Sequence, residues 1–197
     1  MSVSATDVKK LREMTSAGIM DCKQALAETN GNIEKAIESL RKKGIAKAEK
    51  KISRETRDGL IESYIHPGAR LGVLVEINCE TDFVAKTDDF KKFVRDVAMQ
   101  IAASNPLVVT RQELSPELIE KEMNIYKTQV MNQKKPEHIA EKIAQGKMEK
   151  YYQEVCLLEQ SFIKDPNKTI DELNKELIGK LGENIIIRRF VRFQLGE

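Results

Sequence analysis

The sequence contains no tryptophan, only two histidines and three cysteines, and no hydrophobic run approaches the ~20 apolar residues of a membrane span. Cys22, Cys79 and Cys156 lie far apart without a C-x-x-C pair, which is typical of reduced thiols and disfavours a disulfide framework or a zinc site. The opening residues are polar and lack the apolar core of a signal peptide. We therefore expect a cytoplasmic protein without a membrane partner.

A strong charge of one sign is also missing, since 33 basic and 31 acidic residues leave a net charge of +2. Proteins whose affinity depends on neutralising phosphates usually carry a large positive field, so we expect no direct nucleic-acid partner. Apolar residues make up 41% of the chain and charged residues 32%, which is the balance of a folded globular protein. The 197 residues have room for one medium domain and a smaller one.

The N-terminal part predicts three short helices between Asp7 and Lys43, because apolar residues recur there at helical spacing in three bursts. The first break falls at Ser16-Ala17-Gly18. The second falls at Thr29 to Asn32, where a glycine ends one helix and an asparagine caps the next. The apolar positions are Val8, Leu11, Cys22, Ala25, Leu26, Ile33, Ala36, Ile37 and Leu40.

A β-hairpin is predicted from Leu60 to Cys79, with a breaker-rich turn at residues 66–70. The closing run, residues 185–195, is β-branched and aromatic and predicts a third strand for the same sheet. Side chains two apart in a strand share a face, so one face of the second strand should lie on the core. That face carries Leu71, Val73, Val75, Ile77 and Cys79.

The remaining core pattern predicts helices at residues 88–103, 116–130, 136–144, 148–159 and 169–181, the third and fourth being separated near Gly146. The fold class is therefore α+β, with a small N-terminal three-helix bundle followed by a three-stranded antiparallel sheet packed with helices. We expect a three-helix domain at 1–45, a charged helical linker at 46–58 and an α+β core domain at 59–197.

No catalytic constellation is expected. His66 and Cys79 lie at opposite ends of a predicted strand, about 26 Å apart, which is beyond proton-transfer reach. His138 accompanies Glu137 and Glu141 on a predicted helix surface, where solvated side chains are more common than a metal site. No glycine-rich phosphate loop is present. We expect no enzyme activity, no catalytic residue, no cofactor and no metal.

The run from Glu80 to Val84 has two interpretations. It follows an apolar strand, so Thr81 can be a helix cap and Phe83 a core residue, which periodicity alone favours. It can instead be an exposed recognition segment. A calcium site at Glu80 and Asp82 is disfavoured, because the EF-hand spacing is missing.

Three runs resemble the signatures of bacterial elongation factor Ts. They extend from Val8 to Leu26, from Val75 to Ala85, and from Gly182-Glu183-Asn184 into Arg188-Arg189-Phe190. The resemblance implies that the first three helices are similar to a ubiquitin-associated domain and that the remainder grips elongation factor Tu. Ubiquitin binding is not implied by that fold.

The resemblance also implies the function of a guanine nucleotide exchange factor that promotes GDP release and GTP exchange. In the family, a protruding segment inserts into the nucleotide domain of elongation factor Tu, in its GDP-bound and nucleotide-free forms, and disturbs the magnesium site. Carried over to this sequence, the segment is Thr81, Asp82, Phe83 and Val84.

The N-terminal helices resemble the part of the family that docks on the same partner, with Arg12 and Met20 at matching contact positions. Ile19 replaces the methionine that is common there. Long family members carry two related core halves, whereas this chain has room for one, so we expect a symmetric homodimer.

The alternative function is an RNA-binding translation accessory protein that uses the basic linker. Lys47, Lys50 and Lys51, with Arg54 and Arg57, can share a helix face toward phosphates. A solvated surface is the favoured interpretation, because acidic residues interleave and no aromatic stacking residues accompany the cations.

Overall fold

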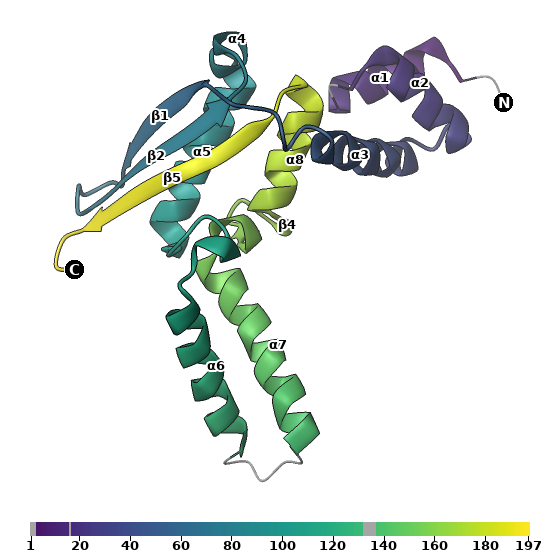
Figure 1. The fold of residues 1–197 in the computed structure, drawn as a ribbon. Coiled ribbons are helices and arrows are strands. Elements are labelled where there is room, and N and C mark those ends of the chain that lie inside the picture. The colour runs from purple at the N-terminus through teal and green to yellow at the C-terminus, as the bar shows by residue number, and fades with distance from the viewer. Residues whose placement is uncertain (1–2, 16, 132–136) are drawn as a thin grey trace. The chain divides into compact units, whose positions relative to one another are not determined.

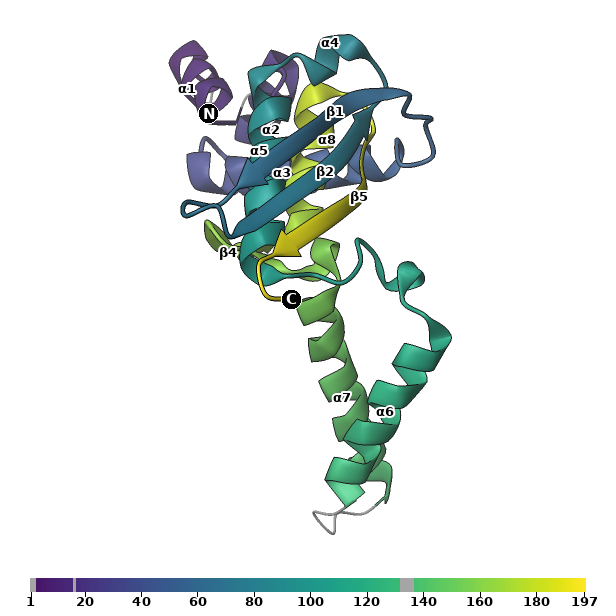
Figure 2. The same cartoon turned by 90° about the vertical axis from the view of Figure 1, so that its left-hand side faces the viewer.

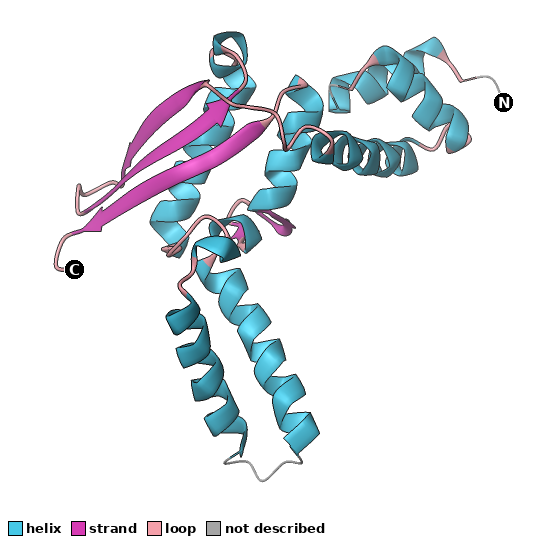
Figure 3. Ribbon diagram, in the orientation of Figure 1, coloured by secondary structure: helices cyan, strands magenta, loops and turns pink. Residues whose placement is uncertain are grey.

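The computed structural model describes residues 3–15, 17–131 and 137–197 (Figure 1). Helices accompany a three-stranded antiparallel sheet, so the predicted α+β class is confirmed (Figure 3). The chain divides into two compact units. The first unit comprises the chain up to Gly59 together with Asn78–Phe90 and Glu172–Ile186, and the second comprises Leu60–Ile77, Lys91–Asp171 and Ile187–Glu197. The domain boundaries expected from the sequence stay a prediction.

The first unit begins with the three expected helices, α1 (Ala5–Thr15), α2 (Ile19–Glu28) and α3 (Ile33–Glu49). Ser16, in the first predicted break, lies outside the described residues. The Asn32 side chain accepts a hydrogen bond from the Lys35 amide at 2.9 Å and so caps α3. The buried core of the bundle is small and consists of Leu11, Cys22, Ala25, Leu26, Ala36 and Leu40.

Helix α3 continues to Glu49 and packs against α8 (Ile170–Leu181). The two helices approach closely at Gly44 and Gly179, where a Cβ on Gly179 would lie 3.1 Å from the Gly44 Cα atom. Arg41 of α3 also pairs with Glu176 of α8 at 2.7 Å. The end of α3 is therefore fixed by tertiary contacts.

The sheet has the strand order β1 (Asp58–Ile65), β2 (Leu71–Cys79) and β5 (Ile185–Gln194). Its central strand, β2, buries the side chains predicted to lie on the core, with Leu71 half-buried at the start of the strand. The β1–β2 hairpin closes where the His66 amide donates to the Leu71 carbonyl at 2.9 Å.

Helix α5 (Asp88–Ser104) lies against one face of the sheet (Figure 2). Its buried side chains recur at spacings of three and four residues, as the sequence predicts. Buried Gln100 donates to the Gln160 side-chain oxygen at 3.1 Å and accepts from the Ile163 amide at 2.9 Å. These two hydrogen bonds connect α5 to residues 160–163, which follow the helices at 116–131 and 137–155 in the chain. The apolar buried positions include Phe93, Val94, Val97 and Ile101.

Two long helices, α6 (Pro116–Met131) and α7 (Glu137–Val155), run side by side in opposite directions (Figure 1). The predicted separation near Gly146 is wrong, because α7 passes through it without a break. A helical glycine costs only about 1 kcal/mol, which packing along α6 outweighs. Pro136, where a helix was expected to begin, lies outside the described residues.

The second unit also contains short elements that the sequence pattern does not predict. They are the 3-10 helices η1 (Arg111–Glu113) and η2 (Leu157–Glu159) and the strand pair β3 (Ser161–Phe162) and β4 (Asp165–Thr169).

Candidate functional site

The chain turns sharply after β2 and forms a single helical turn, α4 (Asp82–Ala85), at the top of the view in Figure 1. We call Glu80–Ala85 the corner. Thr81 occupies the N-cap position with extended backbone angles, φ −134° and ψ 156°, but its side chain makes no capping bond to α4. Its hydroxyl donates instead to a Glu183 carboxylate oxygen at 2.6 Å. The cap predicted for Thr81 is thus positional only.

The corner turns one apolar side chain outward. Phe83 is 79% exposed, whereas its neighbours Val84 and Ala85 are buried. The Lys86 amide donates to the Asp82 carbonyl at 3.1 Å and closes this single helical turn. The interpretation of Phe83 as a core residue is therefore wrong. Successive side chains of a helix point about 100° apart, so a single turn that buries Val84 and Ala85 leaves room for Phe83 to point away from the core.

Asp82 forms an ion pair with Lys86 one turn later, at 2.6 Å between carboxylate oxygen and ammonium nitrogen. This hydrogen bond holds the pKa of Asp82 below its ordinary value, and the same contact raises the pKa of Lys86. The Lys86 side chain is largely exposed and that of Asp82 is half-exposed. In the free protein Asp82 is thus an ionised carboxylate with an intramolecular partner beside the exposed ring.

The corner is fastened from below by the turn between α8 and β5. The Glu183 carboxylate accepts from the backbone amides of Glu80 at 3.1 Å and Thr81 at 3.0 Å, besides the Thr81 hydroxyl. In return, Glu80 accepts from the Asn184 amide at 2.7 Å. In the sequence, Gly182-Glu183-Asn184 is recognisable only as part of the family resemblance, and nothing in its local pattern indicates these bonds.

The Cys79 thiol lies under the corner and is fully buried. It donates to the Thr81 carbonyl at 3.1 Å. Burial, reinforced by the Glu183 charge, raises the pKa of Cys79 to about 11, so the thiol stays protonated at neutral pH. It is a packed donor and lacks the thiolate character of a nucleophile.

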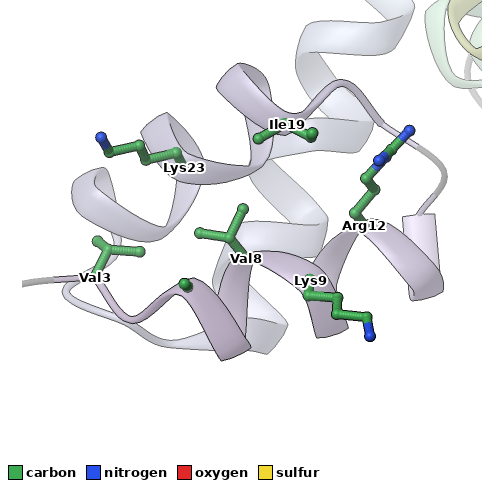
Figure 4. Close-up of a pocket in the computed structure, with 7 residues that line it drawn as sticks. Val3, Val8, Lys9, Arg12, Ile19 and Lys23 are labelled. Atoms are coloured by element: carbon green, nitrogen blue, oxygen red, sulfur yellow. The ribbon is translucent and has the colours of Figure 1, made fainter.

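A second candidate surface lies on the N-terminal bundle, where α1 and α2 form a shallow pocket (Figure 4). Val8 points from α1 toward α2, and the cationic ends of Lys9, Arg12 and Lys23 lie at the periphery of the view. The structure thus places Arg12 with Ile19 at one pocket. Met20 is 74% exposed but does not line it. The lining residues are Val3, Ala5, Val8, Lys9, Arg12, Ile19 and Lys23.

The cations of the predicted linker are mostly engaged within the chain. Lys47 pairs with Asp21 at 2.8 Å, and Arg57 pairs with Glu55 at 2.8 Å. Lys51 donates to the Gly182 carbonyl. These contacts, together with a 3.5 Å pair between Arg54 and Glu80, disfavour a continuous phosphate-binding face.

Within the part of the chain that the structure describes, no group of three or more histidine, cysteine, aspartate or glutamate side chains is arranged to hold a metal ion. Among the same residues, no helix has the length and hydrophobicity needed to cross a membrane.

Comparison with known proteins agrees with the sequence resemblance over nearly the whole chain. The family model described as elongation factor TS matches residues 2–197. The chain belongs to the elongation factor Ts family. Elongation factor Ts from Carboxydothermus hydrogenoformans is 58% identical over 195 residues, which cover 99% of this chain and 90% of that protein. Elongation factor Ts from Thermoanaerobacter sp. strain X514 is 56% identical, with 99% and 96% covered. The chain is therefore a translation elongation factor of this family.

Proposed function

We propose that this family member is a guanine nucleotide exchange factor for elongation factor Tu, and that Thr81, Asp82, Phe83 and Val84 form the segment that loosens the bound nucleotide. The observation that carries the proposal is the exposure of Phe83, 79%, on a corner whose flanking residues are buried or hydrogen-bonded. An aromatic side chain presented in this way suits an anchor that enters an apolar pocket of a partner.

The proposed mechanism requires no covalent chemistry in this chain. The Phe83 ring separates elements of the partner's nucleotide domain, and the adjacent Asp82 carboxylate disturbs the groups that order its magnesium and phosphates. In the free protein Lys86 holds Asp82 at 2.6 Å, so binding exchanges one partner of this carboxylate for another. Val84 is buried and keeps the turn anchored while Phe83 is engaged.

Thermodynamic linkage explains how such a wedge promotes exchange. A nucleotide held with nanomolar affinity is bound by about 12 kcal/mol, so rapid release requires a ternary complex in which that affinity is weakened. Nucleotide must then weaken the binding of the exchange factor by the same factor. The protein therefore binds both the GDP-bound and nucleotide-free forms of the partner and is displaced when GTP enters.

The N-terminal pocket is the proposed second contact with the same partner. Arg12 contributes a cation at its rim, and the exposed Met20 lies next to Ile19 on α2. Isoleucine in place of the methionine common in the family keeps this position apolar while changing its shape.

We further propose that the protein is a cytoplasmic homodimer formed through the open face of the sheet. We call this surface the outer sheet face, and it consists of exposed apolar side chains from all three strands, namely Ile61, Ile65, Leu74, Val191 and Phe193. The Arg189–Glu76 ion pair, at 2.7 Å, lies beside them. A symmetric dimer would cover the face with a second copy of itself. The exposed fraction of these five side chains runs from 39% for Val191 to 72% for Phe193.

The direct test is the release of labelled GDP from purified elongation factor Tu. The wild-type chain should accelerate release, and the Asp82→Ala, Phe83→Ala double variant should lose most of that acceleration. If the double variant leaves both the acceleration and the affinity for elongation factor Tu unchanged, the mechanism is wrong. Glu38→Ala is a matched surface control, because Glu38 makes an exposed i,i+4 contact with Lys42, comparable to the Asp82–Lys86 pair.

A further inference from the structure

We propose that Glu183 is a positioning residue for nucleotide exchange, and that the turn Gly182–Asn184 sets the direction in which Phe83 is presented. The inference rests on the proposed function and adds to it a residue that contacts neither the partner nor the nucleotide. Its basis is the set of hydrogen bonds between this turn and the corner.

Glu183 provides both oxygens to the corner. One accepts from the Thr81 hydroxyl at 2.6 Å, and the other accepts from the amides of Thr81 at 3.0 Å and Glu80 at 3.1 Å. Charge-assisted bonds of this kind are stronger than neutral ones. They fix the backbone of the two residues that immediately precede α4.

The turn Gly182–Asn184 and the corner hydrogen-bond to each other in both directions, an arrangement that we call the clasp, and further bonds connect the turn to the chain after α3. The Glu80 carboxylate accepts from the Asn184 amide at 2.7 Å. The buried Asn184 side chain donates to the carbonyls of Ile52 at 3.0 Å and Arg54 at 2.8 Å, in the turns that follow α3. Gly182 has φ +82°, a conformation that favours glycine, and its carbonyl accepts from Lys51. The turn Gly182–Asn184 is therefore held by its own contacts with residues 51–54, independently of its bonds to the corner.

The need for such a support follows from the length of α4. A helix of four residues, Asp82–Ala85, has almost no stability of its own. Burial of Val84 and Ala85 anchors the far side of the turn, and Glu183 anchors the near side. A wedge that moves freely loses much of its effect, because ordering it on binding consumes interaction energy.

The test compares Glu183→Ala with Glu183→Gln. A glutamine side chain at this position keeps one oxygen to accept from the two backbone amides, and its amide nitrogen can donate to the Thr81 hydroxyl, whereas alanine removes every bond. We expect the maximal rate of GDP release at saturating exchange factor to fall between about tenfold and a hundredfold for Glu183→Ala. Glu183→Gln should restore it to within about threefold of wild type. Glu113→Ala is the control, since the Glu113 carboxylate in the second unit also accepts from two backbone amides, those of Val109 and Thr110, and from the Thr110 hydroxyl.

A mutant cycle separates positioning from a general loss of structure. If Glu183 acts through the corner, Glu183→Ala should cause no further loss in the Asp82→Ala, Phe83→Ala background. A further loss in that background, or a Glu183→Gln variant as impaired as Glu183→Ala, would overturn the positioning role. Backbone amide exchange at Glu80 and Thr81 should quicken in Glu183→Ala alone, and unchanged protection there would also contradict the clasp.

The two proposals fail differently. A wild-type chain that does not accelerate GDP release would remove the proposed function itself, and Phe83→Ala without effect on GDP release would remove the role of the corner. A loss with Phe83→Ala but none with Glu183→Ala would overturn only the positioning role. If Glu183→Ala does not fold, Thr81→Val removes the 2.6 Å bond alone and should show an intermediate loss that is absent in the Asp82→Ala, Phe83→Ala background.

Discussion

Phe83 and Phe193 are exposed to nearly the same extent, 79% and 72%, but their surroundings differ. Phe83 is the exposed apolar residue of a corner that hydrogen bonds hold at Glu80 and Thr81 and where Val84 and Ala85 are buried. Phe193 belongs to the outer sheet face, where the other two strands of the sheet add further apolar side chains. A single fixed ring suits insertion into a pocket, whereas a broad flat face suits burial against a similar face. Exposure alone therefore does not identify the role of an aromatic residue.

The largest expected effect comes from Phe83→Ala. Loss of a central anchor typically costs about 2 kcal/mol or more, so the acceleration of GDP release should fall by about thirtyfold to a hundredfold. The thermal midpoint of the free protein should change little, because the ring is mostly in water. Stopped-flow release of fluorescent GDP and a melting curve measure the two quantities.

Phe193→Ala is the matched control for that comparison, since it removes an equally exposed ring from the second unit. At protein concentrations that keep both variants in the same oligomeric state, it should retain most of the exchange activity. Equal losses in the two variants would show that the corner has no special role.

The second effect concerns self-association. Phe193→Asp places a charge on the outer sheet face and should weaken the proposed dimer by about tenfold to a hundredfold, because a buried unpaired carboxylate is costly. Sedimentation equilibrium of the variant and of Phe83→Asp measures this difference. The corner variant should associate like wild type. A wild-type chain that sediments as a monomer at all concentrations would reject the homodimer.

The fold was predictable where a pattern repeats. Val73, Val75 and Ile77 follow the period of two, and they form the buried face of the central strand. The separation near Gly146 was predicted wrongly because local propensity is weak compared with packing along α6. The β3–β4 pair was missed because two-residue and five-residue strands are too short to display a period.

The candidate site was predictable only in part, for a physical reason. Four residues of α4 span about one turn, so no periodicity tells which of Phe83 and Val84 faces the core. Only the family resemblance pointed to Phe83 as the exposed residue. Glu183 could not be found at all, since its hydrogen-bond partners lie 102 and 103 positions earlier in the chain.

The third effect is a pH dependence of the free energy of unfolding that we expect from the thiol under the corner and not from the outer sheet face. The pKa of Cys79 is raised to about 11, mainly by burial, so the folded state keeps a proton that the unfolded chain releases from about pH 9 upward. The contribution of this thiol to stability is complete below about pH 9 and is lost as the pH rises toward 11, by on the order of 2 kcal/mol. Urea unfolding at about pH 8 and about pH 10.5 measures the loss.

Cys79→Ala supplies the comparison, because it should reduce the pH-dependent part of the loss while Cys156, whose pKa is also about 11, remains. An identical pH dependence in wild type and Cys79→Ala would mean that the thiol under the corner does not contribute. Phe193→Ala should leave the pH dependence unchanged, since that ring does not titrate.

The smallest effect is expected from Lys86→Met, which releases Asp82 while keeping an unbranched side chain of similar length. The pKa of Asp82 should rise toward its ordinary value, because its main cause of depression is the hydrogen bond to Lys86. Exchange should change by no more than about threefold, as is usual for exposed pairs. An increase would mean that Lys86 competes with the partner for the carboxylate, and a decrease that it orients Asp82. Carboxyl chemical shifts followed through an acid titration report the pKa of Asp82, and GDP release reports which of these two roles the lysine has.

Arg189→Met is the control for Lys86→Met, because it breaks the corresponding ion pair with Glu76 on the outer sheet face. It should leave nucleotide release unaltered. A change of nucleotide release in both variants would point to the overall charge of the protein instead of the corner.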